Sequence, residues 1–119
     1  MAFKELSAAQ QEQLIKLRQL ETTLQNIRIQ QAEFNRTLQE NNLTKKELAK
    51  LDPDAQIWKS VGSVMFPKKV SDTLKELTDR IELIELNLKR LSKQETEIKE
   101  KLEELQARLS SQLSSKPSN

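Results

Sequence analysis

The positions of glycine and proline constrain this 119-residue chain more than any other feature. Apart from Pro117, these residues occur only at Pro53, Gly62 and Pro67. Glycine and proline interrupt helices more strongly than other residues do, and leucines with a seven-residue repeat lie on both sides of this window. The sequence therefore predicts two long helices joined by one short irregular connector, with the helices folded back on each other as an antiparallel coiled-coil hairpin.

The composition agrees with a mainly α protein that has a narrow core. Hydrophobic residues make up 35% of the chain and charged residues 32%, whereas a typical globular domain is roughly 45–50% apolar. The mean hydropathy is -0.72. A coiled coil buries one stripe of each helix and leaves the remaining positions in water, so we expect a single domain of this kind.

The apolar residues of both predicted helices follow alternating steps of three and four, the spacing of a coiled-coil seam. In the first helix, predicted over 3–42, the seam residues are Leu17, Leu20, Leu24, Ile27, Phe34 and Leu38. In the second helix, predicted over 71–113, they are Leu74, Leu77, Ile81, Ile84, Leu88, Leu91, Ile98, Leu102 and Leu105. Ser71 or Asp72 is the expected N-cap of the second helix, and 114–119 is expected to be a flexible tail.

Glu95 is the one residue that interrupts the second seam. The simplest pairing of the two helices places it opposite Leu17, where Lys16 and Arg18 would neutralise its charge. We interpret Glu95 as a residue that sets the register of the pair; a functional carboxylate is the alternative.

The connector contains two local signals. Thr44 and Glu47 form a Thr-x-x-Glu capping box, which predicts a separate short helix over 44–51. After the turn around Pro53, two β-prone runs separated by Gly62-Ser63 predict a β-hairpin over 56–67, with Pro67 at its end or on a sheet edge.

The predicted hairpin is too apolar for an exposed loop. Its candidate assembly residues are Ile57, Trp58, Val61, Gly62, Val64, Met65 and Phe66, joined by the off-seam Leu83 and Leu86. These side chains either fold onto the junction of the two helices or are covered in an oligomer whose hairpins form a common sheet. We favour the oligomer, because two helices offer little surface there and an isolated hairpin is marginal in water.

Catalysis is not expected. The chain has no histidine and no cysteine, so it lacks imidazole and thiol groups for base, nucleophile or metal-ligand roles. No phosphate loop or metal-ligand spacing occurs, and we predict neither a cofactor nor a metal. We also find no candidate membrane span or signal-peptide core, and therefore expect a cytoplasmic protein that is not bound to membranes.

The net charge of +2 comes from 20 basic and 18 acidic residues that are interspersed along the chain. The only paired lysines are Lys45-Lys46 and Lys68-Lys69, both near the connector. We interpret them as solvated charge and expect no nucleic-acid partner. A phosphate-binding patch is the alternative.

The stretch from Leu43 to Phe66 resembles the β class of prefoldin subunits. Its specific elements are Leu43-Thr44-Lys45-Lys46-Glu47-Leu48 and, after a turn, Trp58-Lys59-Ser60-Val61-Gly62. The chain departs from the family pattern at Ser63-Val64, ahead of Met65-Phe66. The α class, which has two hairpins in each chain, does not fit, since only one hairpin segment is present.

This resemblance implies a heterohexamer of two α-class and four β-class chains. The hairpins would form a β-barrel body, from which six coiled coils project as tentacles. Such a complex is an ATP-independent holdase that captures unfolded actin and tubulin and passes them to the cytosolic group II chaperonin.

A holdase of this kind needs adaptable apolar surface at the free ends of its coiled coils. We predict that the client-binding residues are Phe3, Leu6, Leu109 and Leu113. The polar residues Gln10 and Gln13 would weaken the seam beside them. The alternative is ordinary seam packing with frayed ends.

Another class of function also fits the heptads. A coiled-coil scaffold or tether without chaperone activity would associate through its helices and would not need the hairpin. A nucleic-acid binder ranks below both.

Overall fold

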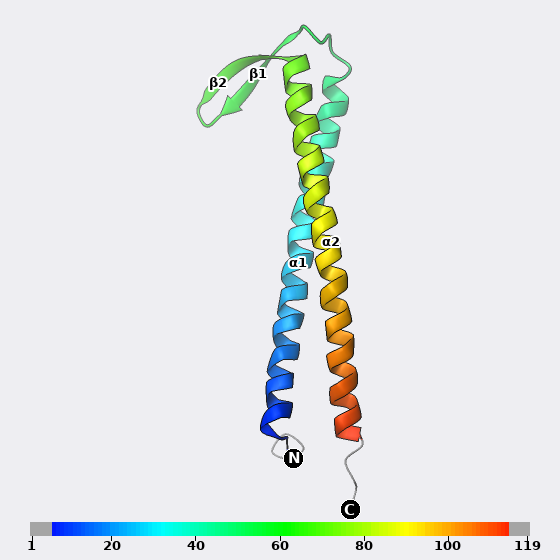
Figure 1. Ribbon diagram of the computed structural model, residues 1–119. Coiled ribbons are helices and arrows are strands. Elements are labelled where there is room, and N and C mark those ends of the chain that lie inside the picture. The colour runs from blue at the N-terminus through cyan, green and yellow to red at the C-terminus, as the bar shows by residue number, and fades with distance from the viewer. Residues whose placement is uncertain (1–5, 115–119) are drawn as a thin grey trace, which may run out of the picture. The chain divides into compact units, whose positions relative to one another are not determined.

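The computed structural model describes residues 6–114, which form two long helices joined by a two-stranded antiparallel sheet (Figure 1). The elements are α1 (Ala8–Leu48), β1 (Gln56–Val61), β2 (Val64–Lys69) and α2 (Val70–Ser114). This mainly α architecture confirms the predicted fold class. The chain divides into two compact units: the first comprises the chain up to Gln30 and from Leu91 onward, and the second comprises Gln31–Arg90.

In the first unit the two helical segments run antiparallel. Leu6 and Leu113 line one groove, and Leu20 and Leu105 line another farther along the pair. The core consists of apolar seam side chains that are almost fully buried, namely Leu24, Ile27, Leu91, Leu102, Leu105 and Leu109. Heptad spacing brings these residues to one side of each helix, and burying that side stabilises the pair.

The register in the first unit differs from the predicted one. Glu95 accepts a hydrogen bond from Arg28, and Leu17 shares a groove with Gln106 and Leu109. Leu17 is therefore not opposite Glu95, and the partner of Glu95 lies about three helical turns farther along α1. The predicted end of the first helix at 42 is also wrong, because α1 continues to Leu48.

The N-terminus of α1 is fixed by a capping box, which the heptad pattern did not reveal. The Ser7 backbone N–H donates to Gln10 Oε1 (3.0 Å), and the Gln10 N–H donates to Ser7 Oγ (3.1 Å). These reciprocal bonds satisfy two amides at the start of the helix. Among the described residues the helix consequently begins at Ala8, after the non-helical Leu6 and Ser7, and the predicted start at 3 lies outside them.

In the second unit α1 continues without interruption to Leu48, and the separate helix predicted over 44–51 does not form. The Thr44 hydroxyl donates to the Glu40 carbonyl (2.9 Å), a bond made within a helix, and does not cap a new one. Asn41, Lys45 and Leu48 are half-buried at seam spacing. Because two of these three are polar, the apolar pattern in the sequence breaks off after Leu38, although the partly buried side of the helix continues to Leu48.

The hairpin is two residues longer than predicted. Its register pairs Gln56 with Lys69, Trp58 with Pro67 and Val61 with Val64. Pro67 therefore lies inside β2 and does not end it. Gly62 has φ 61°, and no described non-glycine residue has positive φ, which is the pattern of a type II′ turn with glycine first.

The connector carbonyls satisfy the first amides of α2. The Val70 N–H donates to the Ala55 carbonyl and the Ser71 N–H to the Pro53 carbonyl, both at 3.0 Å. The helix begins at Val70, whose side chain is fully buried. The predicted N-caps Ser71 and Asp72 thus lie inside the first turn, where no side-chain cap is needed at Ser71 because its amide already has a partner.

Candidate functional site

The hairpin presents apolar side chains that the described part of the chain does not cover. Trp58 is 58% exposed and Phe66 49%. The other exposed apolar residues of the hairpin are Val61, Val64 and Met65, and Ile57 is half-buried. Leu83 and Leu86 on α2 are also exposed. Within residues 6–114, therefore, the helices leave most of the apolar side chains of the hairpin uncovered, contrary to the self-covering alternative.

The strand register divides these side chains between two faces of the sheet. Cross-strand partners share a face and successive residues alternate, so Trp58 and Met65 lie on one face while Val61 and Phe66 lie on the other. Both faces thus carry exposed apolar side chains. This pattern is typical of a strand pair that is covered on both sides, as in an assembly.

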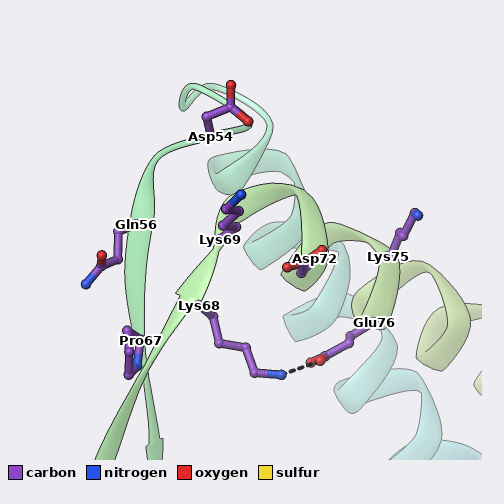
Figure 2. Close-up of a pocket in the computed structure, with 8 residues that line it drawn as sticks. All are labelled: Asp54, Gln56, Pro67, Lys68, Lys69, Asp72, Lys75 and Glu76. Carbon is purple, nitrogen blue, oxygen red and sulfur yellow. Dashed lines mark hydrogen bonds and ion pairs between the residues drawn. The ribbon is translucent and has the colours of Figure 1, made fainter.

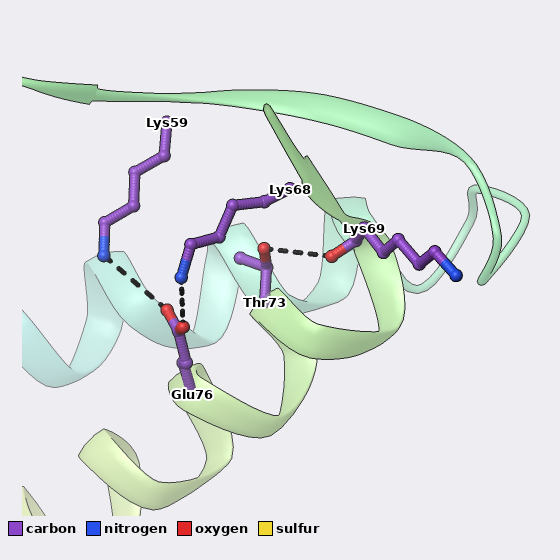
Figure 3. A network of polar contacts seen from close by, with 5 residues as sticks. All are labelled: Lys59, Lys68, Lys69, Thr73 and Glu76. Atoms are coloured by element: carbon purple, nitrogen blue, oxygen red, sulfur yellow. Dashed lines mark hydrogen bonds and ion pairs between the residues drawn. The ribbon is translucent and has the colours of Figure 1, made fainter. Parts of the chain in front are cut away.

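One face is tied to the start of α2 by a charged cluster, which we call the Glu76 clip (Figure 3). Lys68 Nζ donates to Glu76 Oε1, and Lys59 Nζ lies 3.6 Å from Glu76 Oε2. The hydrogen bond from Lys68 and the positive charges of both lysines lower the pKa of Glu76 below its usual value of 4.5. One carboxylate therefore connects both strands to the helix.

The surroundings of the two lysine pairs bear on the alternative that they bind phosphate. Figure 2 shows an open depression at the base of the hairpin, where Lys68 and Lys69 lie among Asp54, Asp72 and Glu76. Carboxylates thus accompany these lysines, which argues against a phosphate patch. The other pair, Lys45-Lys46, lies in the last turn of α1, where positive charge is favoured by the helix dipole.

The predicted seam residues of both helices are all buried or half-buried.

Three of the four predicted client-binding residues lie close together in the structure. Leu6, Leu109 and Leu113 line one groove of about 310 Å³ in the first unit, together with Leu14 and Leu17 and the side chains of Gln10 and Gln106. We call it the apolar groove. Phe3 lies outside the described residues.

The burial of these leucines is graded. Leu109 is buried, Leu6 is half-buried and Leu113 is 49% exposed. Leu14, which the heptad frame excluded, contributes to the same surface. Leu14 does not fit the strict three–four spacing that defines the seam. A groove next to the seam is also lined by residues at flanking positions of the helix.

The two glutamines beside the groove have different roles. Gln10 caps the helix through Ser7, as described above. Gln13 Oε1 is buried and has no hydrogen-bond partner among residues 6–114. An unsatisfied buried acceptor costs roughly 1–3 kcal/mol, and weakening of the seam at Gln13 stays a prediction.

No group of three or more Asp, Glu, His or Cys side chains is placed to hold a metal ion in residues 6–114. Neither of the two described helices combines the length and apolar character needed to cross a bilayer.

The helical hairpin with an uncovered sheet defines a class of coiled-coil assembly subunits, and comparison with known proteins makes the class specific. The family model "Prefoldin subunit" matches residues 11–116. The chain belongs to the prefoldin subunit family, a family of chaperone subunits and not of enzymes. Members of this family assemble with other prefoldin subunits.

Individual relatives agree over nearly the whole chain. This chain is 34% identical to a prefoldin subunit beta of Pyrobaculum arsenaticum over 87% of its own length and 83% of the relative. It is 33% identical to the prefoldin subunit beta of Archaeoglobus fulgidus, over 92% of this chain and 95% of that relative. The crystal structure of the prefoldin beta subunit from Thermococcus strain KS-1 superposes with a TM-score of 0.82 at 30% identity, covering 93% of this chain and 96% of that one.

Proposed function

We propose that this protein is one β-class subunit of a heterohexameric prefoldin, with two α-class and three further β-class partners. Within the β class, the Leu43–Phe66 motif is most similar to the eukaryotic subunit 1 type. The complex acts in the cytoplasm as an ATP-independent holdase. It binds unfolded chains such as actin and tubulin and delivers them to the cytosolic group II chaperonin.

Assembly through the hairpin follows from the physical chemistry of its side chains. Trp58 and Met65 on one face and Phe66 on the other expose apolar area in the isolated chain. Burying such area contributes about 25 cal/mol per Å², and the closure of neighbouring hairpins into a barrel also removes unpaired strand edges. Leu83 and Leu86 add further exposed apolar area on α2.

Client binding is assigned to the apolar groove, with Leu6, Leu109 and Leu113 and with Phe3 beyond the described residues. The observation that carries this assignment is a groove lined by five leucines at the end of the first unit in a chain of the prefoldin family. One groove of this size gives weak affinity. Six of them acting on one client raise the effective concentration, so weak contacts suffice.

Holding requires reversible contacts, and the groove has two features that support them. Leu113 is half-exposed and available to a client. Gln13 leaves an unsatisfied buried acceptor next to the groove, so separating the helices there costs less than in a fully apolar seam. Neither feature requires nucleotide hydrolysis.

The client assignment is tested by Leu6→Ser combined with Leu113→Ser in the assembled complex. These positions avoid the buried Leu109, whose change would also damage packing. Ile15→Ser with Ile29→Ser is the matched control, because both isoleucines are exposed on α1 outside the groove. We expect the groove variant to lose at least half of its suppression of client aggregation while the control retains it. Equal suppression by both variants would contradict the assignment.

The assembly assignment is tested separately by Trp58→Ser and Phe66→Ser in a chain co-expressed with its partner subunits. We expect each change to prevent hexamer formation while circular dichroism shows unchanged helix content. Native mass measurement distinguishes the hexamer from the dimers or tetramers expected of a coiled-coil tether.

A further inference from the structure

The hairpin is joined to α2 at two places. The first is its base, where the Val70 N–H donates to the Ala55 carbonyl and the Thr73 hydroxyl donates to the Lys69 carbonyl. The second is the Glu76 clip (Figure 3). Beyond the base, no other hydrogen bond or ion pair within residues 6–114 links the two strands to a helix. Among these residues the clip is therefore the polar contact that can fix the direction of the hairpin.

Apolar packing within residues 6–114 does little to fix this direction. Val61, Val64 and Phe66 share one face of the sheet with the lysines of the clip, and about half of each is exposed. Ile57 on the same face is half-buried, but it lies close to the base. A segment with few buried apolar contacts moves easily. Held only at its base, the hairpin would be free to change its angle to α2.

The clip acts at a distance from the base. Lys59 follows Gln56 along β1 by about 10 Å, the rise of three strand residues. Glu76 follows Val70 along α2 by about 9 Å, the rise of six helical residues. A contact this far from the base on both elements limits the angle between them, because any swing of the hairpin would separate Lys59 from Glu76.

The two carboxylate oxygens of Glu76 contact lysines of different strands. Lys68 of β2 donates to Oε1, and Nζ of Lys59 of β1 lies 3.6 Å from Oε2. Rotation of the hairpin about its long axis would move one lysine toward α2 and the other away from it. The two contacts together therefore oppose rotation as well as swinging. Ion pairs as exposed as these add little to the stability of a chain, so their effect is on direction.

We propose that Glu76 is a positioning residue for subunit assembly, which holds the hairpin of the free chain in the direction that partner subunits receive. This rests on the assembly role proposed above and adds a residue outside the apolar contact surface. Association costs the freedom of every segment that it orders, and a segment that is already oriented loses less. Association is also slower when it requires a conformational change. The clip should therefore speed association, whereas dissociation depends mainly on the apolar contacts.

The direction of the hairpin is measured in the free full-length chain. Because the chain has no cysteine, Ser63→Cys in the turn and Glu82→Cys at an exposed position of α2 accept spin labels at defined places. Double electron–electron resonance then gives the distribution of distances between the labels. We expect Glu76→Gln to widen this distribution at least twofold. The matched control is Asp79→Asn, which removes an exposed carboxylate of α2 that forms no ion pair within residues 6–114 and should leave the distribution unchanged.

The effect on assembly is measured as the rate constant for association with an α-class prefoldin subunit, by stopped-flow light scattering. We expect Glu76→Gln to slow association at least threefold and to change the dissociation rate less than twofold. Glu76→Lys should slow association further, because it places three positive charges together. Adding Lys59→Glu and Lys68→Glu to Glu76→Lys exchanges the charges of the clip. This triple variant should regain the wild-type distance distribution and rate, a rescue that a role of Glu76 in packing would not produce.

An unchanged distance distribution in Glu76→Gln would overturn the positioning role, whatever the association rate. A wider distribution with an unchanged rate constant would also overturn the proposal, since the direction of the hairpin would then not limit assembly. If the wild-type chain formed no complex, the assembly role proposed above would fail instead, and the distance measurement would still decide whether the clip orients the hairpin.

Discussion

Arg28 Nε lies 3.3 Å from Glu95 Oε2 and joins α1 to α2 within the first unit. The side chain of Glu95 is only 22% exposed, because it occupies a seam position between Leu91 and Ile98. The positive charge of Arg28 compensates the negative charge of Glu95, which the heptad spacing places beside the core. A compensated charge of this kind sets register more than it adds stability.

We predict that Glu95→Leu raises the stability of the chain by about 1 kcal/mol, since a well-packed apolar residue in place of a partly buried ion pair is often stabilising. Glu95→Ala, which removes the pair without filling the seam, should lower it by up to about 1 kcal/mol. Urea unfolding followed by circular dichroism measures both. A Leu variant less stable than the Ala variant would disprove this account of the seam.

Gln13→Leu is expected to stabilise the first unit by about 1 kcal/mol, because it removes a buried acceptor without a partner and adds apolar area. The matched control is Gln19→Leu at an exposed position of α1, which should leave the thermal midpoint unchanged. We also expect Gln13→Leu to weaken client holding, as a tighter seam opens less readily. Stabilisation without any loss of holding would show that opening is not required.

Gly62→Ala is expected to destabilise the hairpin by about 1–2 kcal/mol, the cost of placing a side chain at positive φ. A Cβ at this position meets no atom within 4 Å, so steric contact adds nothing and the effect is purely conformational. Hydrogen exchange of the strand amides measures it. Ser63→Ala, next in the same turn, should exchange like the wild type, and similar rates in all three proteins would refute the turn assignment.

The Glu76 clip should respond to acid. The pKa of Glu76 is lowered in the folded chain, so the clip contributes stability above pH 4.5, the ordinary value, and this contribution is lost as the pH falls below it through the folded pKa. We expect the amide resonances of Lys59 and Lys68 to shift together over that range. In Glu76→Gln they should already resemble the acid form at pH 7, and a variant that titrates like the wild type would rule out the clip as the cause.

Local patterns in the sequence predicted the two long helices and the hairpin of this fold, although the Thr44–Glu47 pattern also predicted a separate short helix that does not form. Heptad leucines predicted two helices, and the predicted seam residues lie buried or half-buried because periodicity alone determines which side of a helix is apolar. Gly62-Ser63 between two β-prone runs predicted the hairpin, since a two-residue turn there requires a positive φ that glycine adopts without strain. The motif from Leu43 to Phe66 correctly indicated the prefoldin family.

The sequence did not determine how these elements meet, because that depends on contacts between residues far apart in the chain. Polar Asn41 and Lys45 concealed the continuation of α1 to Leu48, and the simplest pairing of the heptads gave Glu95 the wrong partner. The Glu76 clip joins residues of two strands and a helix, and no local spacing signals it.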